Sequence, residues 1–113
     1  MEEKSFDKNG EKMIEGWLKS DPQIKHLTLR AIKSLPQKIN EISQALKTHS
    51  YKKAAFKVHN LKGLALNFNL KQIYTITDKL NKELKKNKLD YKKIDLLYQE
   101  LDKLVKMIPD SYL

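Results

Sequence analysis

The 113-residue sequence predicts an all-α protein, an antiparallel up-down four-helix bundle with a short additional N-terminal helix. Hydrophobic residues recur at spacings of three and four along most of the chain, which is the period of an amphipathic helix. With only 3 Gly and 3 Pro, the chain has few positions suited to tight turns. No segment alternates like a strand, and four long apolar stripes joined by short breaks are typical of an up-down bundle.

We expect two regions, an N-terminal extension over residues 1–20 and the bundle over residues 21–109. Residues 1–9 are polar and are expected to be loosely ordered. A short helix is predicted over residues 11–19, and Trp17 is placed to cap one end of the bundle. The apolar side of this short helix consists of Met13, Ile14, Trp17 and Leu18.

The first long helix is predicted to begin at Asp21-Pro22, with Asp as the N-cap and Pro at the first helical position. Pro36 should kink this helix or split it, because proline removes a backbone donor. The helix should run to a break at residues 48–50. Its apolar stripe consists of Ile24, Leu27, Ala31, Leu35, Ile39, Ile42, Ala45 and Leu46.

The second long helix is predicted from Tyr51 to about Leu66, with Ser50 as its N-cap. It should end at residues 67–69, because asparagine tolerates the left-handed conformation that closes many helices. The apolar stripe of this helix consists of Ala54, Val58, Leu61, Ala65 and Phe68.

The last two helices are predicted over residues 70–86 and 91–107, with a turn at 87–90 and Pro109 ending the second. Their inward residues are Ile73, Ile76, Thr77, Leu80 and Leu84, and Ile94, Leu97, Leu101, Leu104 and Ile108. Four tyrosines are expected at the edge of the core: Tyr51, Tyr74, Tyr91 and Tyr98.

The composition excludes several classes of function. Cysteine is absent, so the chain has no disulfide, no thiolate nucleophile and no cysteine-based zinc site. The histidines at 26, 49 and 59 match no standard metal-ligand spacing, so no metal site is expected. There is no apolar run long enough for a membrane span and no signal-peptide pattern, and we expect a cytoplasmic protein without membrane contact. Without a glycine-rich nucleotide loop, no cofactor is expected in this chain.

A formal net charge of +9 favours an acidic partner surface. Arg30 is the single arginine, which argues against nucleic acid because arginine is the usual reader of guanine. We favour a solvated lysine-rich face over a phosphate-binding patch, although a basic helical nucleic-acid binder remains an alternative function. The clustered lysines are Lys79, Lys82, Lys85, Lys86, Lys88, Lys92 and Lys93.

The most informative residues are His59-Asn60-Leu61-Lys62-Gly63, within the second long helix. His59 falls about 120° from the centre of the apolar stripe, and Lys62 and Gly63 lie one turn further on the same side. Glycine inside a helix costs roughly 1 kcal/mol relative to alanine, so its presence there suggests that space beside the imidazole is needed. His26 and His49 have no such neighbours and are interpreted as ordinary histidines.

Residues 55–70 resemble the phosphorylation motif of histidine-containing phosphotransfer (HPt) domains. That family has a histidine followed by Leu-Lys-Gly and usually a glycine about ten residues after the histidine. His59, Leu61, Lys62 and Gly63 match this pattern, whereas Asn69 stands in place of the later glycine. Because asparagine also accepts a positive φ, we expect the turn to be kept. Leu35-Pro36 and Ala45-Leu46 fit the preceding helix of the family, and the resemblance extends over residues 21–108.

The resemblance implies a four-helix bundle that relays phosphate without an ATP-dependent kinase activity of its own. His59 would accept a phosphoryl group from the aspartate of a receiver domain and pass it to another receiver aspartate. Lys62 would offset charge on the phosphoryl oxygens, and Gly63 would leave room for the phosphoryl group and the partner. The partners implied are response-regulator receiver domains or a hybrid sensor histidine kinase, with Mg²⁺ held by the receiver.

Four further residues are candidates for partner binding: Phe56, Asn60, Leu66 and Asn67. Phe56 and Leu66 lie on the same outer half of the helix as His59, so each could contact a receiver or be buried by the N-terminal helix. A second alternative function also remains, in which the bundle acts as an adaptor and His59 is not phosphorylated.

Overall fold

The computed structural model describes the backbone of residues 2–18 and 22–113 and the side chains of residues 10–18 and 24–113. Five α-helices and one short 3₁₀ turn, with no strand, make up the described chain. The prediction of an all-α fold is confirmed. The elements are α1 (Glu2–Trp17), α2 (Pro22–Lys47), α3 (Tyr51–Asn67), α4 (Lys71–Leu84), α5 (Tyr91–Lys106) and η1 (Asp110–Tyr112).

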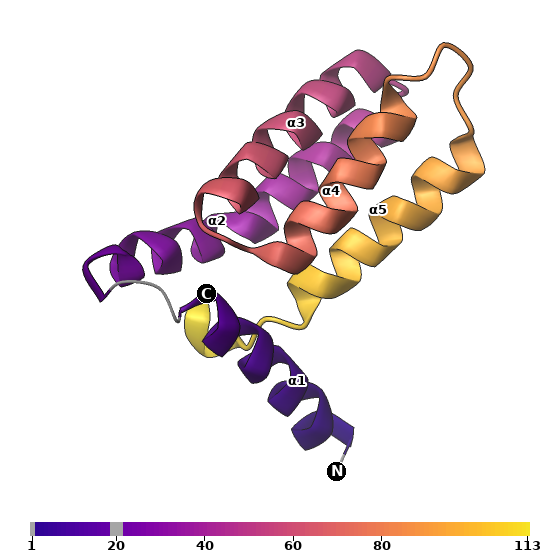
Figure 1. Ribbon diagram of the computed structural model, residues 1–113. Helices are drawn as coiled ribbons and strands as arrows, with labels where there is room; N and C mark the ends of the chain where they lie inside the picture. The colour runs from indigo at the N-terminus through magenta and orange to yellow at the C-terminus, as the bar shows by residue number, and fades with distance from the viewer. Residues whose placement is uncertain (1, 19–21) are drawn as a thin grey trace.

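Helices α2 to α5 lie side by side and form the bundle (Figure 1). Each helix packs against the next one in the chain, and α2 also packs against α5, which closes the ring. Short turns reverse the direction of the chain between successive helices, as in an up-down bundle. The chain order therefore places α3 between α2 and α4.

The core consists largely of the apolar stripes that the sequence predicts, and it also contains Ile32, Leu70 and Val105, which those stripes did not include. All of the bundle helices contribute side chains with almost no exposed surface, so apolar burial is the main stabilising contribution. The largest of these core side chains are Ile32, Leu35, Ile42, Leu61, Leu70, Ile73, Leu80 and Leu101.

Helix α1 is longer than predicted, because it begins at Glu2 rather than near residue 11. Its polar first half carries no hydrophobic period, although glutamate and lysine propagate a helix well. The predicted capping by Trp17 is confirmed: its side chain is buried, and its Nε1 donates a hydrogen bond to Oε1 of Gln72, 2.9 Å away in the first turn of α4. Met13 and Ile14 join the same core.

Helix α2 is continuous through Pro36, so the predicted alternative of a split helix is wrong. Leu35 and Ile39 are buried on either side of Pro36, and their packing compensates for the backbone hydrogen bond that proline cannot donate. The helix begins at Pro22 as predicted, whereas the N-cap predicted at Asp21 lies outside the described residues.

The N-terminal end of the α2 stripe differs from expectation, because Ile24 and Leu27 are 42% and 43% exposed. The 26 residues of α2 span about 39 Å and the 17 residues of α3 about 26 Å, at a rise of about 1.5 Å per residue. The start of α2 therefore extends beyond the end of α3 (Figure 1). Residues there have less neighbouring chain to cover them.

The turns on both sides of α3 contain a residue in the left-handed conformation. Asn69 has φ 58°, which confirms the expected turn, and His49 has φ 56°, which the sequence did not indicate. The backbone of the following residue closes each turn, Leu70 N–H to Ala65 O and Ser50 N–H to Ala45 O, both at 2.8 Å.

Ser50 is the N-cap of α3 as predicted, although its side chain makes no capping hydrogen bond and its Oγ lies 3.1 Å from Oγ1 of Thr48. Two other local predictions need correction. Helix α4 ends at Leu84, two residues early, because the next four residues, 85–88, are Lys-Lys-Asn-Lys and have no apolar side chain to bury. Tyr91 is 61% exposed rather than at the edge of the core, and its ring centroid lies 5.4 Å from that of Tyr51.

Within residues 2–18 and 22–113, none of the helices has both the length and the apolar character that crossing a lipid bilayer requires.

Gly10 provides a test of the position of α1. A Cβ added to Gly10 would overlap the carbonyl oxygen of Met107, whereas one added to Gly16 of the same helix would meet no described atom within 4 Å. We expect Gly10→Ala to destabilise the protein by about 1–3 kcal/mol, because backbone must move to make room. Gly16→Ala should be neutral or slightly stabilising. Thermal unfolding of both variants measures the difference, and equal melting temperatures would contradict the packing of α1 against the end of α5.

Candidate functional site

His59 lies in the middle of α3, and its side chain is exposed, as predicted. The neighbouring residues Val58 and Leu61 are buried, so they fix the rotation of the helix that turns His59 outward. The imidazole is therefore presented to solvent on a rigid helix rather than on a loop. That position gives an incoming molecule access to the ring without any rearrangement of the core.

Gly63 lies one helical turn after His59 and is also exposed. Its φ is not positive, so its backbone conformation does not require glycine. Apart from its two chain neighbours and the nearby backbone of its own helix, a Cβ added there would meet no atom of the described residues within 4 Å, so packing within the domain does not require glycine either. The open surface beside His59 has no explanation inside the bundle and fits the approach of another molecule.

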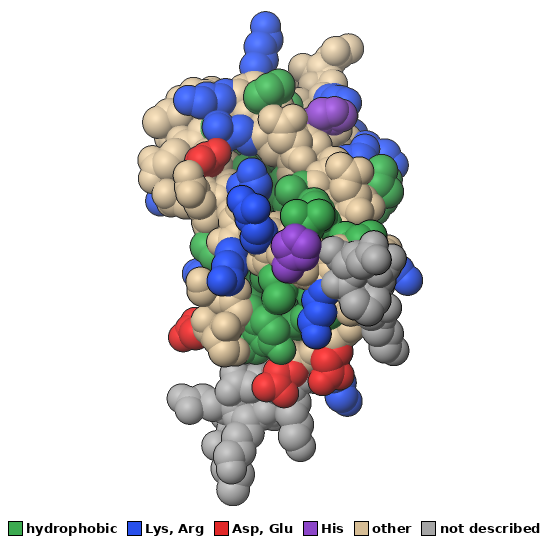
Figure 2. All heavy atoms as spheres, turned by 90° about the vertical axis from the view of Figure 1, so that its left-hand side faces the viewer, with side chains coloured by type: hydrophobic (Ala, Val, Ile, Leu, Met, Phe, Trp, Pro, Cys, Tyr) green, Lys and Arg blue, Asp and Glu red, His purple; other side chains and the backbone are tan. Residues whose placement is uncertain are grey.

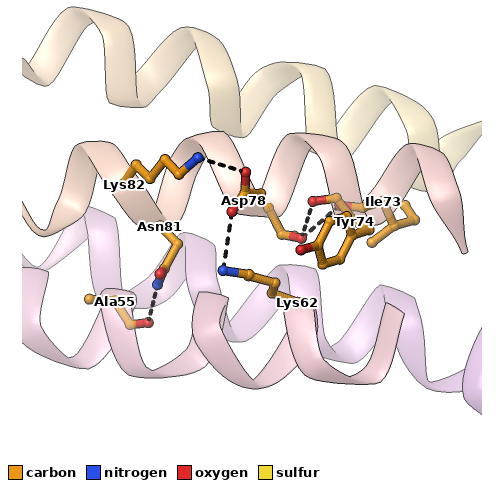
Figure 3. Close-up of polar contacts among 8 residues, drawn as sticks. Ala55, Lys62, Ile73, Tyr74, Asp78, Asn81 and Lys82 are labelled. Carbon is orange, nitrogen blue, oxygen red and sulfur yellow. Dashed lines mark hydrogen bonds and ion pairs between the residues drawn. The ribbon is translucent and has the colours of Figure 1, made fainter. Parts of the chain in front are cut away.

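Lys62 extends from α3 to α4, where its Nζ lies 3.1 Å from Oδ1 of Asp78 (Figure 3). The same Nζ lies 6.0 Å from the centroid of the Tyr74 ring. Oδ2 of Asp78 is 3.1 Å from Nζ of Lys82, which comes from the next turn of α4. The ammonium of Lys62 thus has an acidic partner that the sequence analysis did not identify.

These contacts favour the ionised form of the Asp78 carboxyl group and lower its pKa. The hydrogen bond from Lys62 is the largest cause that lowers the pKa of its carboxyl group, followed by the hydrogen bond from Lys82. Partial burial acts in the opposite direction but is weaker. At neutral pH this carboxylate is therefore shared by two ammonium groups.

A second contact joins α3 to α4 on the other side of His59. The buried amide of Asn81 donates from Nδ2 to the backbone oxygen of Ala55, 3.3 Å away. In an α-helix that oxygen also accepts the backbone N–H of the residue four positions later, which is His59. Asn81 and Asp78 therefore hold α4 against Ala55 and Lys62 of α3 (Figure 3). These two residues precede and follow His59 along the helix.

The sequence offered an indication of Asn81 but not of Asp78. Asn81 lies four residues after Thr77 and one after Leu80, within the predicted inward side of α4. A polar residue on an apolar side needs a hydrogen-bond partner, which the sequence does not name.

The opposite flank of α3 carries a similar ion pair. Nζ of Lys57 lies 3.1 Å from Oε1 of Glu41 on α2, and the hydrogen bond from Lys57 is the main cause that lowers the pKa of the Glu41 carboxyl group. Helix α3 is thus connected by lysine–carboxylate pairs to both neighbouring helices. The pair at Lys57 provides a matched control for the pair at Lys62.

The candidate partner-binding residues are all exposed. Phe56 and Leu66 are 65% and 64% exposed, so the alternative that the N-terminal helix buries them is wrong. Asn60 and Asn67 are exposed as well. A surface cavity of about 270 Å³ adjoins Leu66 between α3 and α4. Its lining comprises Ala65, Leu66, Asn69, Lys71, Tyr74 and Thr75.

Positive charge is distributed over the surface together with hydrophobic side chains. Figure 2 shows one face on which hydrophobic side chains gather near the middle and Lys and Arg side chains lie beside them. Within the lysine cluster, Nζ of Lys86 and Nζ of Lys93 lie 2.8 Å and 3.3 Å from Oε2 of Glu83. Part of the local positive charge is therefore compensated by acidic side chains.

Comparison with known proteins gives the family. A model of the Hpt domain matches residues 28–107, more than half of the chain, and this range contains His59, Lys62 and Gly63. No curated protein and no solved structure gave a significant match. Hpt domains generally interact with receiver domains, and they carry phosphoryl groups on histidine without being kinases. The sequence match, the helical bundle and the exposed histidine agree, and the chain belongs to the Hpt domain family, whose members transfer phosphoryl groups in two-component phosphorelays.

Proposed function

We propose that His59 is the phosphorylated residue, and that the chain accepts a phosphoryl group from the aspartate of one receiver domain and passes it to the aspartate of another. The observation that carries this proposal is an exposed histidine on α3, within the residues that match the family and beside the open surface at Gly63. Histidine is suited to the role because its neutral ring is a nucleophile near neutral pH.

The transfer step exchanges one bond to phosphorus for another. The lone pair of an imidazole nitrogen of His59 forms the N–P bond while the P–O bond to the receiver aspartate breaks, and the electron pair leaves with the carboxylate. The other ring nitrogen keeps its proton. The reverse reaction passes the phosphoryl group to the next receiver. We propose that Mg²⁺, where it is needed, is held by the receiver and not by this chain.

Two neighbours of His59 have proposed roles. Lys62 lies one turn away and supplies positive charge to the phosphoryl oxygens as the bonds exchange. Gly63 lets the phosphoryl group and the receiver surface approach the ring, because the surface there is open. Both roles depend on how closely the partner docks on α3.

The receiver is proposed to dock on the exposed side of α3. Phe56 and Leu66 offer apolar contacts at either end of the site, and Asn60 and Asn67 offer polar ones. A receiver with an acidic pocket complements the net charge of +9, which would speed association at low salt.

His59→Gln tests the proposed phosphorylation site. Glutamine preserves polarity without the nucleophilic ring, so uptake of acid-labile phosphate from a phosphorylated receiver should be abolished, while helicity measured by circular dichroism stays unchanged. His26→Gln and His49→Gln are controls at exposed histidines and should be labelled like the original protein. Continued labelling of the His59→Gln protein would end the relay hypothesis.

Gly63→Leu tests the need for open surface. The leucine side chain would project beside the imidazole, one turn away, and should slow transfer strongly. Leucine also favours the helix by roughly 1 kcal/mol, so thermal stability should be kept or improved. Gly16→Leu adds the same side chain to an exposed helical glycine outside the site and should leave transfer unchanged. Equal transfer rates for the Gly63 and Gly16 variants would show that the open surface has no role.

Lys62→Ala distinguishes a local action of Lys62 on the phosphoryl group from general electrostatic attraction between the basic surface and the receiver. If Lys62 acts on the transferring phosphoryl group, its removal should slow transfer in the docked complex and change docking affinity only modestly. Added salt should weaken docking and change transfer within the docked complex much less, because exposed charges are screened over about 10 Å at 0.1 M ionic strength. Single-turnover transfer at saturating receiver and several salt concentrations distinguishes the two effects. A Lys62→Ala variant that changes affinity alone would assign Lys62 to the general basic surface.

A further inference from the structure

We infer that Asp78 is a positioning residue that competes with the phosphoryl group for the ammonium of Lys62, and that Lys82 allows Lys62 to be released. This inference deepens the proposed function and rests on phosphorylation at His59. The observation that carries it is the arrangement of one carboxylate between two lysines at the contact of α3 with α4 (Figure 3).

The three side chains differ in their freedom to move. Lys62 and Asp78 are half-buried, with side chains 26% and 25% exposed, whereas the Lys82 side chain is 72% exposed. Both lysine Nζ atoms lie 3.1 Å from the Asp78 carboxylate, one at each oxygen. The pair Asp78–Lys82 lies within α4 at a spacing of four residues, so it is maintained by the helix itself and does not depend on α3.

The charges favour exchange when a phosphoryl group arrives. Two ammonium groups share a single carboxylate, so this group of three carries a net charge of +1 at neutral pH. A phosphoryl group carries about −1.5 to −2 charge and three acceptor oxygens, which makes it a stronger partner for an ammonium than half of a carboxylate. Lys62 lies one turn from His59, where the long lysine side chain has a phosphoryl group within reach.

Lys82 reduces the free-energy cost of releasing Lys62 from Asp78. A half-buried carboxylate that loses its only cation is left unpaired, which is unfavourable because its charge stays only partly solvated. Here Asp78 retains Lys82 when Lys62 leaves, so its charge stays compensated. Removing Lys82 should therefore bind Lys62 more tightly to Asp78, and removing the charge of Asp78 should free Lys62 for the phosphoryl group.

Phosphorylation by phosphoramidate tests this exchange with a small donor and no partner protein. The lone pair of His59 forms an N–P bond while the N–P bond of phosphoramidate breaks. The phosphoramidate nitrogen takes a proton from solvent and leaves as ammonia. We expect Asp78→Asn to increase the labelling rate by about two- to fivefold, the range expected for a partly exposed ion pair. Lys82→Ala should decrease it by a similar factor. In a Lys62→Ala background both effects should disappear.

Controls separate this role from a structural one. Glu41→Gln removes the carboxylate of the matched pair on the other flank of α3, also 3.1 Å from its lysine, and should leave the labelling rate unchanged. A purely structural Asp78 would give a slower or equal rate after substitution, which would overturn the inference. An effect of equal size in the Lys62→Ala background would also overturn it, because the charge of the carboxylate alone would then be responsible.

The outcomes also separate this inference from the proposed function. Absence of labelling in every variant would reject phosphorylation at His59 and this inference with it. Normal labelling that is insensitive to both Asp78 and Lys82 would reject the exchange and leave the phosphorylation site intact. Lys82 is highly exposed, so Lys82→Ala preserves the fold and tests the exchange even if Asp78→Asn destabilises the bundle.

Discussion

The packing of α3 against α4 is the interaction on which the rest of the site depends. The buried side of α3 consists of Ala54, Val58, Leu61 and Ala65, and the small alanines let neighbouring helices approach closely. Asn81 and Asp78 add directional contacts from α4 to this apolar surface. Because the buried side fixes the rotation of α3, the exposed side is fixed as well, and His59 and Gly63 lie on it.

This arrangement separates stability from function on a single helix. The residues that hold α3 in place are buried or half-buried, while the candidate phosphorylation and docking residues are exposed. A change on the outer side therefore leaves the core untouched. Lys62 is the exception, since it contacts α4 through Asp78 and also lies one turn from His59. That double position makes it the residue through which the packing of the bundle and the proposed phosphoryl transfer are most directly connected.

The sequence predicted the bundle because hydrophobic periodicity is local: each stripe can be recognised without knowing its neighbours. The same stripe on α3 also predicted the outward direction of His59, and the residue type at Asn69 predicted its turn. The contacts of Lys62 and Asn81 could not be predicted, because they depend on which sides of α3 and α4 meet. The exposure of Ile24 and Leu27 depends on the relative lengths of α2 and α3, and the start of α1 has no hydrophobic period to reveal it.

The order of the helices around the ring has a consequence for how the chain folds. Three of the four packed pairs join helices that are consecutive in the sequence, and the pair α2–α5 joins helices that are distant. Contacts between consecutive helices require closure of short loops, which costs little chain entropy and favours rapid folding. The α3–α4 hairpin, which carries His59, Lys62 and Asp78, is one of these local units. The part of the molecule that bears the candidate site thus needs no long-range closure to assemble, and the slower step is left to the opposite side of the ring.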